Sequence, residues 1–154
     1  IEVAIKWPND IYAGDKKIAG ILTEFATDPD RIEYMIIGVG VNCHWAPLET
    51  PPGGLPATSI FKEAGKKISR LDLLTCFLRH GEACYERVPT EGVGFLRQEW
   101  NHNSLVNNRR VTLINSQTSW TGRAQGIDEQ GGLILLLDNG RRETFLTGDV
   151  HLRF

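Results

Sequence analysis

The sequence lacks several features that would assign it to a specialised class of protein. Neither sign of charge dominates, because 17 lysines and arginines stand against 19 aspartates and glutamates and the net charge is −2. This balance gives no basic surface for nucleic acid. No apolar run approaches the roughly 18 residues of a membrane-spanning helix, and no charged-then-apolar signal peptide stands at the start. We therefore expect a cytoplasmic globular protein without membrane contact.

Cysteine and methionine are scarce as well. The three cysteines, Cys43, Cys76 and Cys84, are odd in number and lack the spacing of metal ligands, which favours reduced thiols. The single methionine is Met35, and the opening IEVAIK alternates with the period of a strand. We therefore expect the chain to begin inside a β-strand, downstream of further sequence.

The first 59 residues are patterned as strands followed by a long loop. Residues 9–25, NDIYAGDKKIAGILTEF, predict a hairpin whose turn contains Gly14, a residue able to adopt positive φ. Residues 33–42 are nearly continuous in Met, Ile and Val, which is typical of a strand covered on both faces. The four prolines and two glycines of WAPLETPPGGLPATS, residues 45–59, then predict a long loop.

Two helices and a group of short strands are predicted in the remainder. Residues 69–88 follow helical spacing after the capping pattern of Ser69 and Asp72. The buried side of a second helix, residues 91–100, is expected to comprise Phe95, Leu96 and Trp100. The segments RRVTLI, SWTGRAQGID, GGLILLLDNG and RRETFLTGDVHLRF predict a small β-barrel. The sequence thus predicts an α+β protein, with a mixed-sheet domain over 1–104 and a barrel over 105–154.

The segment KWPNDIYAGDKKIAGIL, Lys6 to Leu22, concentrates polar chemistry beside an apolar strand. Asn9 and Asp10 offer an amide and a carboxylate at a strand end, and Lys17 is expected to face Asp10 across the hairpin. Gly20 would let a ligand approach the backbone. The alternative is a solvated hairpin whose charges have no further role.

The run GVGVN, residues 38–42, places two glycines at alternate positions of an apolar strand. This spacing removes side chains from one face, so that a flat group can lie against it, and Asn42 follows at the strand end. Neither the P-loop pattern nor the dinucleotide-binding pattern is present. The alternative is that the glycines admit a packed neighbour.

In combination these segments resemble the C-terminal two-thirds of a biotin protein ligase. The resemblance rests on KWPNDIY, KKIAGIL, IIGVGVN, ATSI and the ending GIDEQGGLILLLDNG…GDVHLR, in this order over nearly the whole chain. It implies part of a class II synthetase-like catalytic domain, a mixed sheet with helices, followed by a small SH3-like β-barrel.

The resemblance also implies a two-step reaction. Biotin and ATP, with Mg²⁺, give biotinyl-5′-AMP and pyrophosphate, and a carrier lysine then displaces AMP. Lys17 matches the lysine at the biotin carboxyl, and Asp10 is a candidate to orient the incoming amine. The remaining matches are Gly20, Leu22, Gly38 and Gly40 on the wall of the biotin pocket, and Asn9, Asn42 and Arg153 on the nucleotide side, with Asn42 and Asp10 as candidate Mg²⁺ contacts.

The implied partner is the biotin carboxyl carrier protein of acetyl-CoA carboxylase or a related carboxylase. The Gly- and Arg-rich loop of the family is absent from the sequence, so we expect these 154 residues alone to form little biotinyl-AMP. A homodimer and an upstream DNA-binding helix-turn-helix are left open. Two alternatives remain, a lipoate–protein ligase of the same catalytic architecture and a non-catalytic ligase-like binding module.

Overall fold

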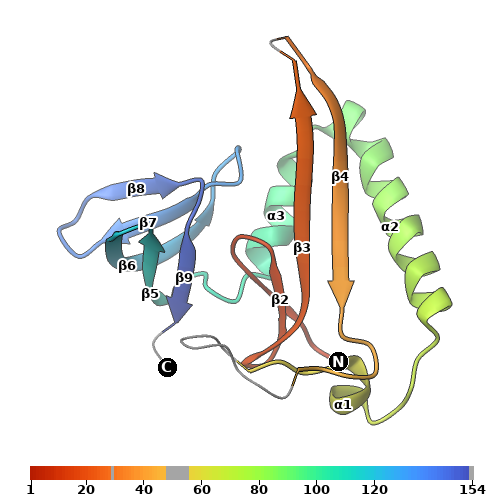
Figure 1. Ribbon diagram of the computed structural model, residues 1–154. Helices are drawn as coiled ribbons and strands as arrows, with labels where there is room; N and C mark the ends of the chain where they lie inside the picture. Colours follow the sequence, from red (N-terminus) through yellow and green to blue (C-terminus); the bar gives the residue numbers. More distant parts are fainter. Residues whose placement is uncertain (29, 48–55, 153–154) are drawn as a thin grey trace. The chain divides into compact units, whose positions relative to one another are not determined.

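The computed structural model describes residues 1–28, 30–47 and 56–152 and has the mixed helix and sheet fold that the sequence predicts. It separates into two compact units, one of residues 1–3 and 9–68 and the other of residues 4–8 and 69–154. Each unit contains a β-sheet (Figure 1). The predicted domain boundary at residue 104 stays a prediction, because compactness alone does not show which segments fold independently.

The first unit is built on an antiparallel sheet in which β3 (Lys16–Thr27) lies between β2 (Asp10–Ala13) and β4 (Ile32–Val41). The predicted hairpin is confirmed, since Ala13 pairs with Lys16 and Gly14 occupies the turn with a φ of 61°. The short helix α1 (Ile60–Ala64) follows the long connection after β4. Its N-cap is a serine that precedes an apolar residue, which is a usual helix start.

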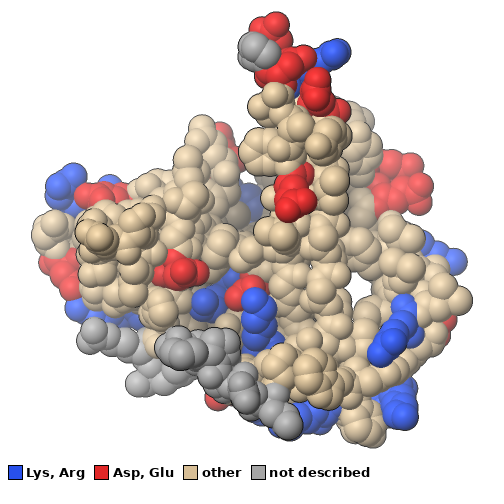
Figure 2. Space-filling view, in the orientation of Figure 1, with Lys and Arg blue, Asp and Glu red and all other residues tan. Residues whose placement is uncertain are grey.

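Strand β4 is apolar but is not covered on both faces, so this expectation is wrong for the described residues. Nearly every residue of β4 is exposed, and Ile36 and Ile37 retain 55% and 59% of their accessible surface. Figure 2 shows acidic side chains gathered at the tip of the β3–β4 hairpin, above a largely uncharged surface. Within this unit β4 pairs with β3, which lies beside it and not over it. An apolar pattern identifies a strand that can be buried, but it does not supply the covering partner.

Helix α2 (Arg70–Glu91) begins where the sequence predicts and ends later. The side chain of Ser69 accepts a hydrogen bond from the backbone N–H of Asp72 at 3.2 Å, which confirms the predicted cap. The helix continues past the predicted end at Val88 with Pro89 inside it. The apolar side chains of α2 are exposed, by 47% to 81% for Leu71, Leu74, Phe77, Leu78 and Tyr85.

Helix α3 (Gly94–His102) starts three residues later than predicted, after Gly92 ends α2. Trp100 packs against the hydrophobic core of the second unit, as expected. The guanidinium of Arg87 lies over the ring of Phe95, 3.9 Å from its centroid. Leu96 is 38% exposed, so its predicted burial is wrong.

The C-terminal part of the second unit is an SH3-like antiparallel sheet of strand order β8-β7-β6-β5-β9. Its strands are β5 (Arg110–Asn115), β6 (Thr118–Ile127), β7 (Leu133–Leu137), β8 (Arg142–Phe145) and β9 (Asp149–Leu152). The pairings among the described residues leave β8 and β9 at the ends, so they do not close the predicted barrel. The core contains Leu113, Leu133 and Leu135, each fully buried.

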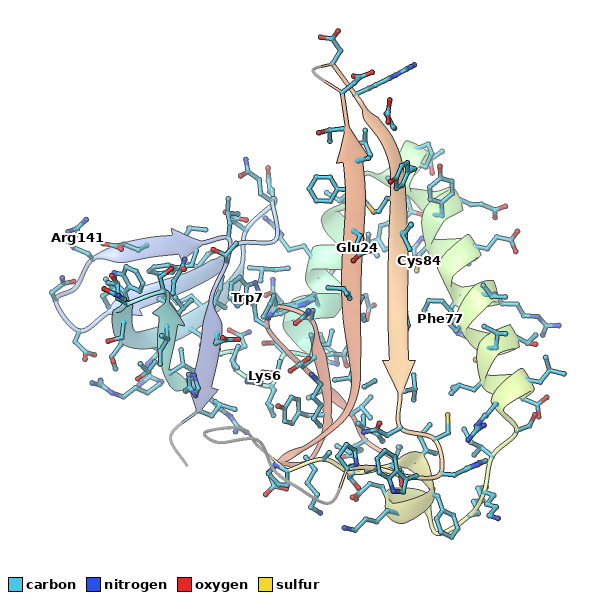
Figure 3. The ribbon with its side chains drawn as sticks, in the orientation of Figure 1. Lys6, Trp7, Glu24, Phe77, Cys84 and Arg141 are labelled. Carbon is cyan, nitrogen blue, oxygen red and sulfur yellow. The ribbon has the colours of Figure 1, made fainter. Side chains whose placement is uncertain are left out.

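The segment of residues 4–8 belongs to this second unit. Strand β1 (Ala4–Lys6) is shorter than the predicted strand over residues 1–6, and Ile5 bonds through its backbone to Asn103 and Leu105 at 2.7 Å each. Trp7 is 2% exposed, packs in the core, and donates its indole N–H to the carbonyl oxygen of Gly131 at 3.0 Å (Figure 3). The Lys-Trp-Pro part of the first motif therefore has a packing role.

Candidate functional site

An open pocket of about 490 Å³ lies in the first unit, at the junction of β2, β3 and β4. Its lining includes seven of the predicted site residues: Asn9, Asp10, Lys17, Gly20, Leu22, Gly38 and Gly40. Ile21 and Val39 complete the described lining. Two motifs that are separate in the sequence therefore form one site.

The charged part of the pocket is an ion pair. The Nζ atom of Lys17 lies 2.5 Å from Oδ1 of Asp10, so the predicted pairing across the hairpin is confirmed. The Lys17 and Asp10 side chains are 42% and 21% exposed, so both remain within reach of a ligand. The pair can present an ammonium to an anionic group and a carboxylate to a cationic one.

A β-bulge places this pair. Asp10 pairs with Gly20, but Tyr12 pairs with Lys17, so β3 contains one extra residue, Ile18, between the two pairings. Residues three apart on a regular strand point to opposite faces. The extra residue puts Lys17 and Gly20 on the same face, the face that carries Asp10.

The buried phenol of Tyr12 supports this arrangement. Tyr12 is 3% exposed and shares a face of β2 with Asp10. Burial raises the pKa of Tyr12 above its usual range, and the negative charge of Asp10 raises it further. The tyrosine is thus a neutral neighbour of the ion pair.

Gly20 has a specific steric task. A Cβ atom at this position would lie 3.2 Å from both Cε and Nζ of Lys17 and 3.3 Å from Oδ1 of Asp10. These are tighter than ordinary contacts, so the absence of a side chain leaves room for the ion pair. The sequence interpretation, in which Gly20 admits a ligand, missed this role.

Gly38 and Gly40 form the open floor of the pocket. They pair with Leu22 and Gly20 and lie on the same face as the ion pair. A Cβ atom would come within 3.5 Å of the Leu22 carbonyl oxygen at Gly38 and 3.9 Å of the Gly20 carbonyl oxygen at Gly40, which are ordinary contacts. Among the described residues no side chain packs tightly at either glycine, which favours the flat-ligand interpretation.

The side-chain amides of the two predicted asparagines, Asn9 and Asn42, donate hydrogen bonds to backbone carbonyl oxygens. Nδ2 of Asn9 donates to the carbonyl oxygen of Ile21 at 2.7 Å, and the Ile21 N–H donates to the Asn9 carbonyl oxygen at 2.9 Å. Nδ2 of Asn42 donates to the carbonyl oxygen of Thr58 at 3.0 Å, just beyond the end of β4. Arg153 lies outside the described residues.

Beside the pocket, Thr58, Glu63 and Lys16 form a polar group that the sequence motifs do not indicate. Thr58 is fully buried, and its hydroxyl donates to Oε1 of Glu63 at 2.5 Å. Nζ of Lys16, the neighbour of Lys17 on β3, lies 3.6 Å from the same carboxylate oxygen. The Thr58 hydrogen bond is the main cause that lowers the pKa of Glu63, and the charge of Lys16 adds to it. The serine cap of α1 signals a helix start, but nothing local in the sequence signals this contact.

Metal binding has limited support from the side chains. No cluster of three or more histidine, cysteine, aspartate or glutamate residues occurs within the described ranges. Asp10 offers one carboxylate, already paired with Lys17. Across the same ranges, none of the helices combines the length and apolar character required to cross a membrane.

The site thus combines an apolar, glycine-floored wall with a cation and a carboxylate at one end. Such a wall accommodates a flat apolar group, because the backbone itself is the contact surface. An ammonium fixed beside it stabilises negative charge on that group, as preorganised cationic donors do. The geometry suits a flat ligand with a carboxylate.

Comparisons with known proteins agree with these motifs. The model of the Biotin/lipoate A/B protein ligase family matches residues 1–42, and the model of the Biotin protein ligase C terminal domain matches residues 107–153. The chain is 34% identical to the Bifunctional ligase/repressor BirA of Bacillus subtilis, over 99% of this chain and 47% of the relative. It is 33% identical to the Biotin--[acetyl-CoA-carboxylase] ligase of Mycobacterium tuberculosis, over 99% and 54%.

Among solved structures, the biotin protein ligase from Aquifex aeolicus in complex with biotin and ATP superposes with a TM-score of 0.77 and 26% identity. That match covers 99% of this chain and 62% of the Aquifex chain. The present chain spans about half the length of the curated relatives it matches.

Proposed function

We propose that this chain, which belongs to the biotin protein ligase family, supplies one wall of the site at which the complete protein attaches biotin to a lysine of a carrier domain. The carrier is the biotin carboxyl carrier protein of acetyl-CoA carboxylase or a related carboxylase, which places the reaction in the cytoplasm. The observation that supports this most is the ion pair of Lys17 and Asp10 above the floor formed by Gly38 and Gly40.

The first step joins biotin to AMP. A carboxylate oxygen of biotin attacks the α-phosphorus of ATP, an O–P bond forms, and pyrophosphate leaves. Negative charge on the carboxylate and on the phosphoryl oxygens must be held together during this attack. Lys17 is placed to stabilise that charge, and losing one such donor typically lowers a rate by about 10²–10³-fold.

The second step transfers biotin to the carrier. The lysine amine of the carrier attacks the acyl carbon, a C–N bond forms, and AMP leaves with the bonding electrons of the C–O bond. The amine must lose a proton to solvent and approach the acyl carbon from above or below the plane of the acyl group. Asp10 is placed to orient the amine, while Lys17 stabilises the negative charge that develops on the acyl oxygen and on the departing AMP.

The remaining predicted contacts complete this proposal. We assign Gly20, Leu22, Gly38 and Gly40 to the wall that receives the fused rings of biotin. The resemblance assigns Asn9, Asn42 and Arg153 to nucleotide binding, with Arg153 outside the described residues. Magnesium enters as a co-substrate with ATP, because this ion keeps most of its contacts to phosphate and water and needs few protein ligands. Asp10 would offer this ion one carboxylate oxygen and Asn42 one amide oxygen, and the phosphates and water would supply the remaining contacts.

A lipoate–protein ligase is the competing function, because the match over residues 1–42 is to a family model that includes both activities. The separate match to a biotin protein ligase C-terminal domain over residues 107–153 supports biotin. A non-catalytic binding module is disfavoured by the preorganised ion pair. Dimerisation and DNA binding by the complete protein stay open.

Two measurements on the complete protein test the proposal. Isothermal calorimetry should detect biotin and not lipoate, and the reverse result would replace the proposed function with its competitor. Lys17→Ala should lower biotin-dependent pyrophosphate release by about 10²–10³-fold, whereas Lys66→Ala, at an exposed lysine after α1, should leave it unchanged. Normal carrier biotinylation by Lys17→Ala would remove the catalytic role assigned to this residue.

A further inference from the structure

The backbone of Lys17 is held by a segment that follows the long connection. Residues 56–60, which we call the return segment, run parallel to β3 at Lys17. The Lys17 N–H donates to the carbonyl oxygen of Pro56 at 2.8 Å, and the Thr58 N–H donates to the carbonyl oxygen of Lys17 at 2.8 Å. Both backbone polar groups of the proposed catalytic lysine are therefore bonded to this segment.

The return segment occupies the place beside β3 where β4 ends. The Asn42 N–H donates to the carbonyl oxygen of Ile18 at 2.9 Å, and the Ile60 N–H donates to the carbonyl oxygen of Asn42 at 2.8 Å. The Asn42 side chain adds its bond to the Thr58 carbonyl oxygen. Asn42 thus links the end of β4 to both β3 and the return segment.

Thr58 fixes the segment from inside. It is the residue of this segment with no exposed surface, and Glu63 at the end of its hydroxyl bond belongs to α1. Glu63 in turn reaches Lys16 on β3. The Thr58 hydroxyl is buried and donates to a charged group, and such hydrogen bonds are among the stronger ones, so removing the hydroxyl should loosen the segment at the point where it holds Lys17.

We propose that Thr58 is a positioning residue for Lys17: its hydroxyl bond to Glu63 fixes the return segment, whose backbone bonds set the place of the Lys17 ammonium beside Asp10. The inference rests on the proposed function for the role of Lys17, and on the hydrogen bonds and the ion pair described above for the position of its side chain. The Thr58 hydroxyl bonds to Glu63, and neither residue is part of the described pocket lining, so the effect of this bond on catalysis passes through Lys17.

A double-mutant cycle in the complete protein tests whether Thr58 affects catalysis through Lys17. Thr58→Val should lower kcat for pyrophosphate release by about tenfold, and Thr58→Ser, which keeps the hydroxyl, should stay within about twofold of the parent, because loss of positioning is a partial loss of the donor. In a Lys17→Ala background, Thr58→Val should change kcat by less than about twofold, since residues that act through one another are not additive. A full tenfold loss in that background would overturn the proposal.

A second measurement, the chemical labelling of Lys17, does not depend on catalytic activity. Amine labelling by an N-hydroxysuccinimide ester, followed by peptide mass spectrometry, measures how freely the Lys17 ammonium leaves its partner. Thr58→Val should raise the labelling rate of Lys17 severalfold and leave Lys66 unchanged. Thr75→Val is the matched control, because its hydroxyl bonds within α2 to the Leu71 carbonyl oxygen. Equal labelling of Lys17 in the parent and in Thr58→Val would overturn the proposal.

If Thr58→Val does not fold, Glu63→Ala is the second variant, because Glu63 is partly exposed and its replacement removes the same hydrogen bond. This variant should raise the labelling rate of Lys17 in the same way. A complete parent protein that releases no pyrophosphate would refute the proposed function. The labelling experiment would still decide whether Thr58 positions Lys17, so the two failures are distinguishable.

Discussion

The ammonium of Lys17 lies 2.5 Å from the carboxylate of Asp10, and a Cβ atom at Gly20 would lie 3.2 Å from the ammonium and 3.3 Å from the carboxylate. The pair is partly exposed, so its own contribution to stability is about 1 kcal/mol or less. Its importance is therefore in placing charge at one end of a pocket. The consequences below follow from that placement and from the packing around it.

Gly20 and Gly38 should differ when each is replaced by alanine. Gly20→Ala puts a Cβ atom 3.2 Å from Nζ of Lys17 and should lower kcat for adenylate formation by about tenfold, because the donor is displaced. Gly38→Ala meets only ordinary contacts, and should instead raise the Kd for biotin by covering the floor. Steady-state kinetics with biotin titration separates the two effects, and identical profiles for both variants would contradict their assignments.

Asp10→Asn should separate the two chemical steps. The variant keeps the shape of the side chain but removes the charge proposed to orient the carrier amine. We expect transfer from preformed biotinyl-5′-AMP to fall by about tenfold or more, up to the roughly 10²–10⁴-fold contributed by a positioned acid or base, and adenylate formation to fall less. Single-turnover assays of each step measure this difference. Asp15→Asn, in the exposed turn of the hairpin, is the control, and an equal loss in both steps would argue against the orienting role.

Glu63 should titrate below the usual range of a glutamate. Thr58 holds its pKa down, Lys16 on β3 and Lys62 on α1 act in the same direction, and Glu2 and Asp15 line the neighbouring surface. Because the folded pKa is lowered, the stabilisation is present above the unfolded value and is lost as pH falls through the folded value. Carboxyl NMR titration of the parent and of Thr58→Val should show the pKa rising in the variant. An unchanged pKa would show that the hydroxyl bond does not control this carboxylate.

The bidentate ion pair of Arg110 with Asp138 should add little stability. Its guanidinium nitrogens lie 2.7 and 2.5 Å from the Asp138 carboxylate, but both side chains are at least half exposed. Arg110→Ala should therefore cost about 1 kcal/mol or less. Leu133→Ala, in the fully buried core, should cost about 2–5 kcal/mol. Urea unfolding followed by tryptophan fluorescence gives both values, and a reversed order would contradict this view of the second unit.

Local patterns in the sequence predicted those features that depend on neighbouring residues. The hairpin turn at Gly14 and the cap at Ser69 are set by a few adjacent side chains, and both are confirmed. The end of α2 was predicted too early, because a proline usually stops a helix. Here Pro89 lies in the last turn, where Arg87 forms hydrogen bonds of 2.9 and 2.8 Å with Glu91.

The sequence indicated residues that line the pocket, but not the backbone geometry that brings them together. The motifs identified Lys17, Asp10 and the glycines, because these residue types are suited to holding a flat carboxylate ligand. They did not reveal the bulge at Ile18, since an extra residue in one strand is visible only against its partner. The contact of Thr58 with Glu63 was missed for a similar reason, because it joins a buried loop residue to a short helix.

The bulge at Ile18 also limits how this segment can vary in length. The three-residue spacing of Lys17 and Gly20 works only together with the bulge, because the same spacing on a regular strand would turn Lys17 to the face opposite Asp10. Deleting Ile18 would restore a regular strand in which Lys17 and Gly20 are two residues apart, so Lys17 would still share the face of Asp10. This stretch can therefore change in length only if the bulge changes with it, and the direction of the lysine side chain is set by the residue spacing and the strand geometry together.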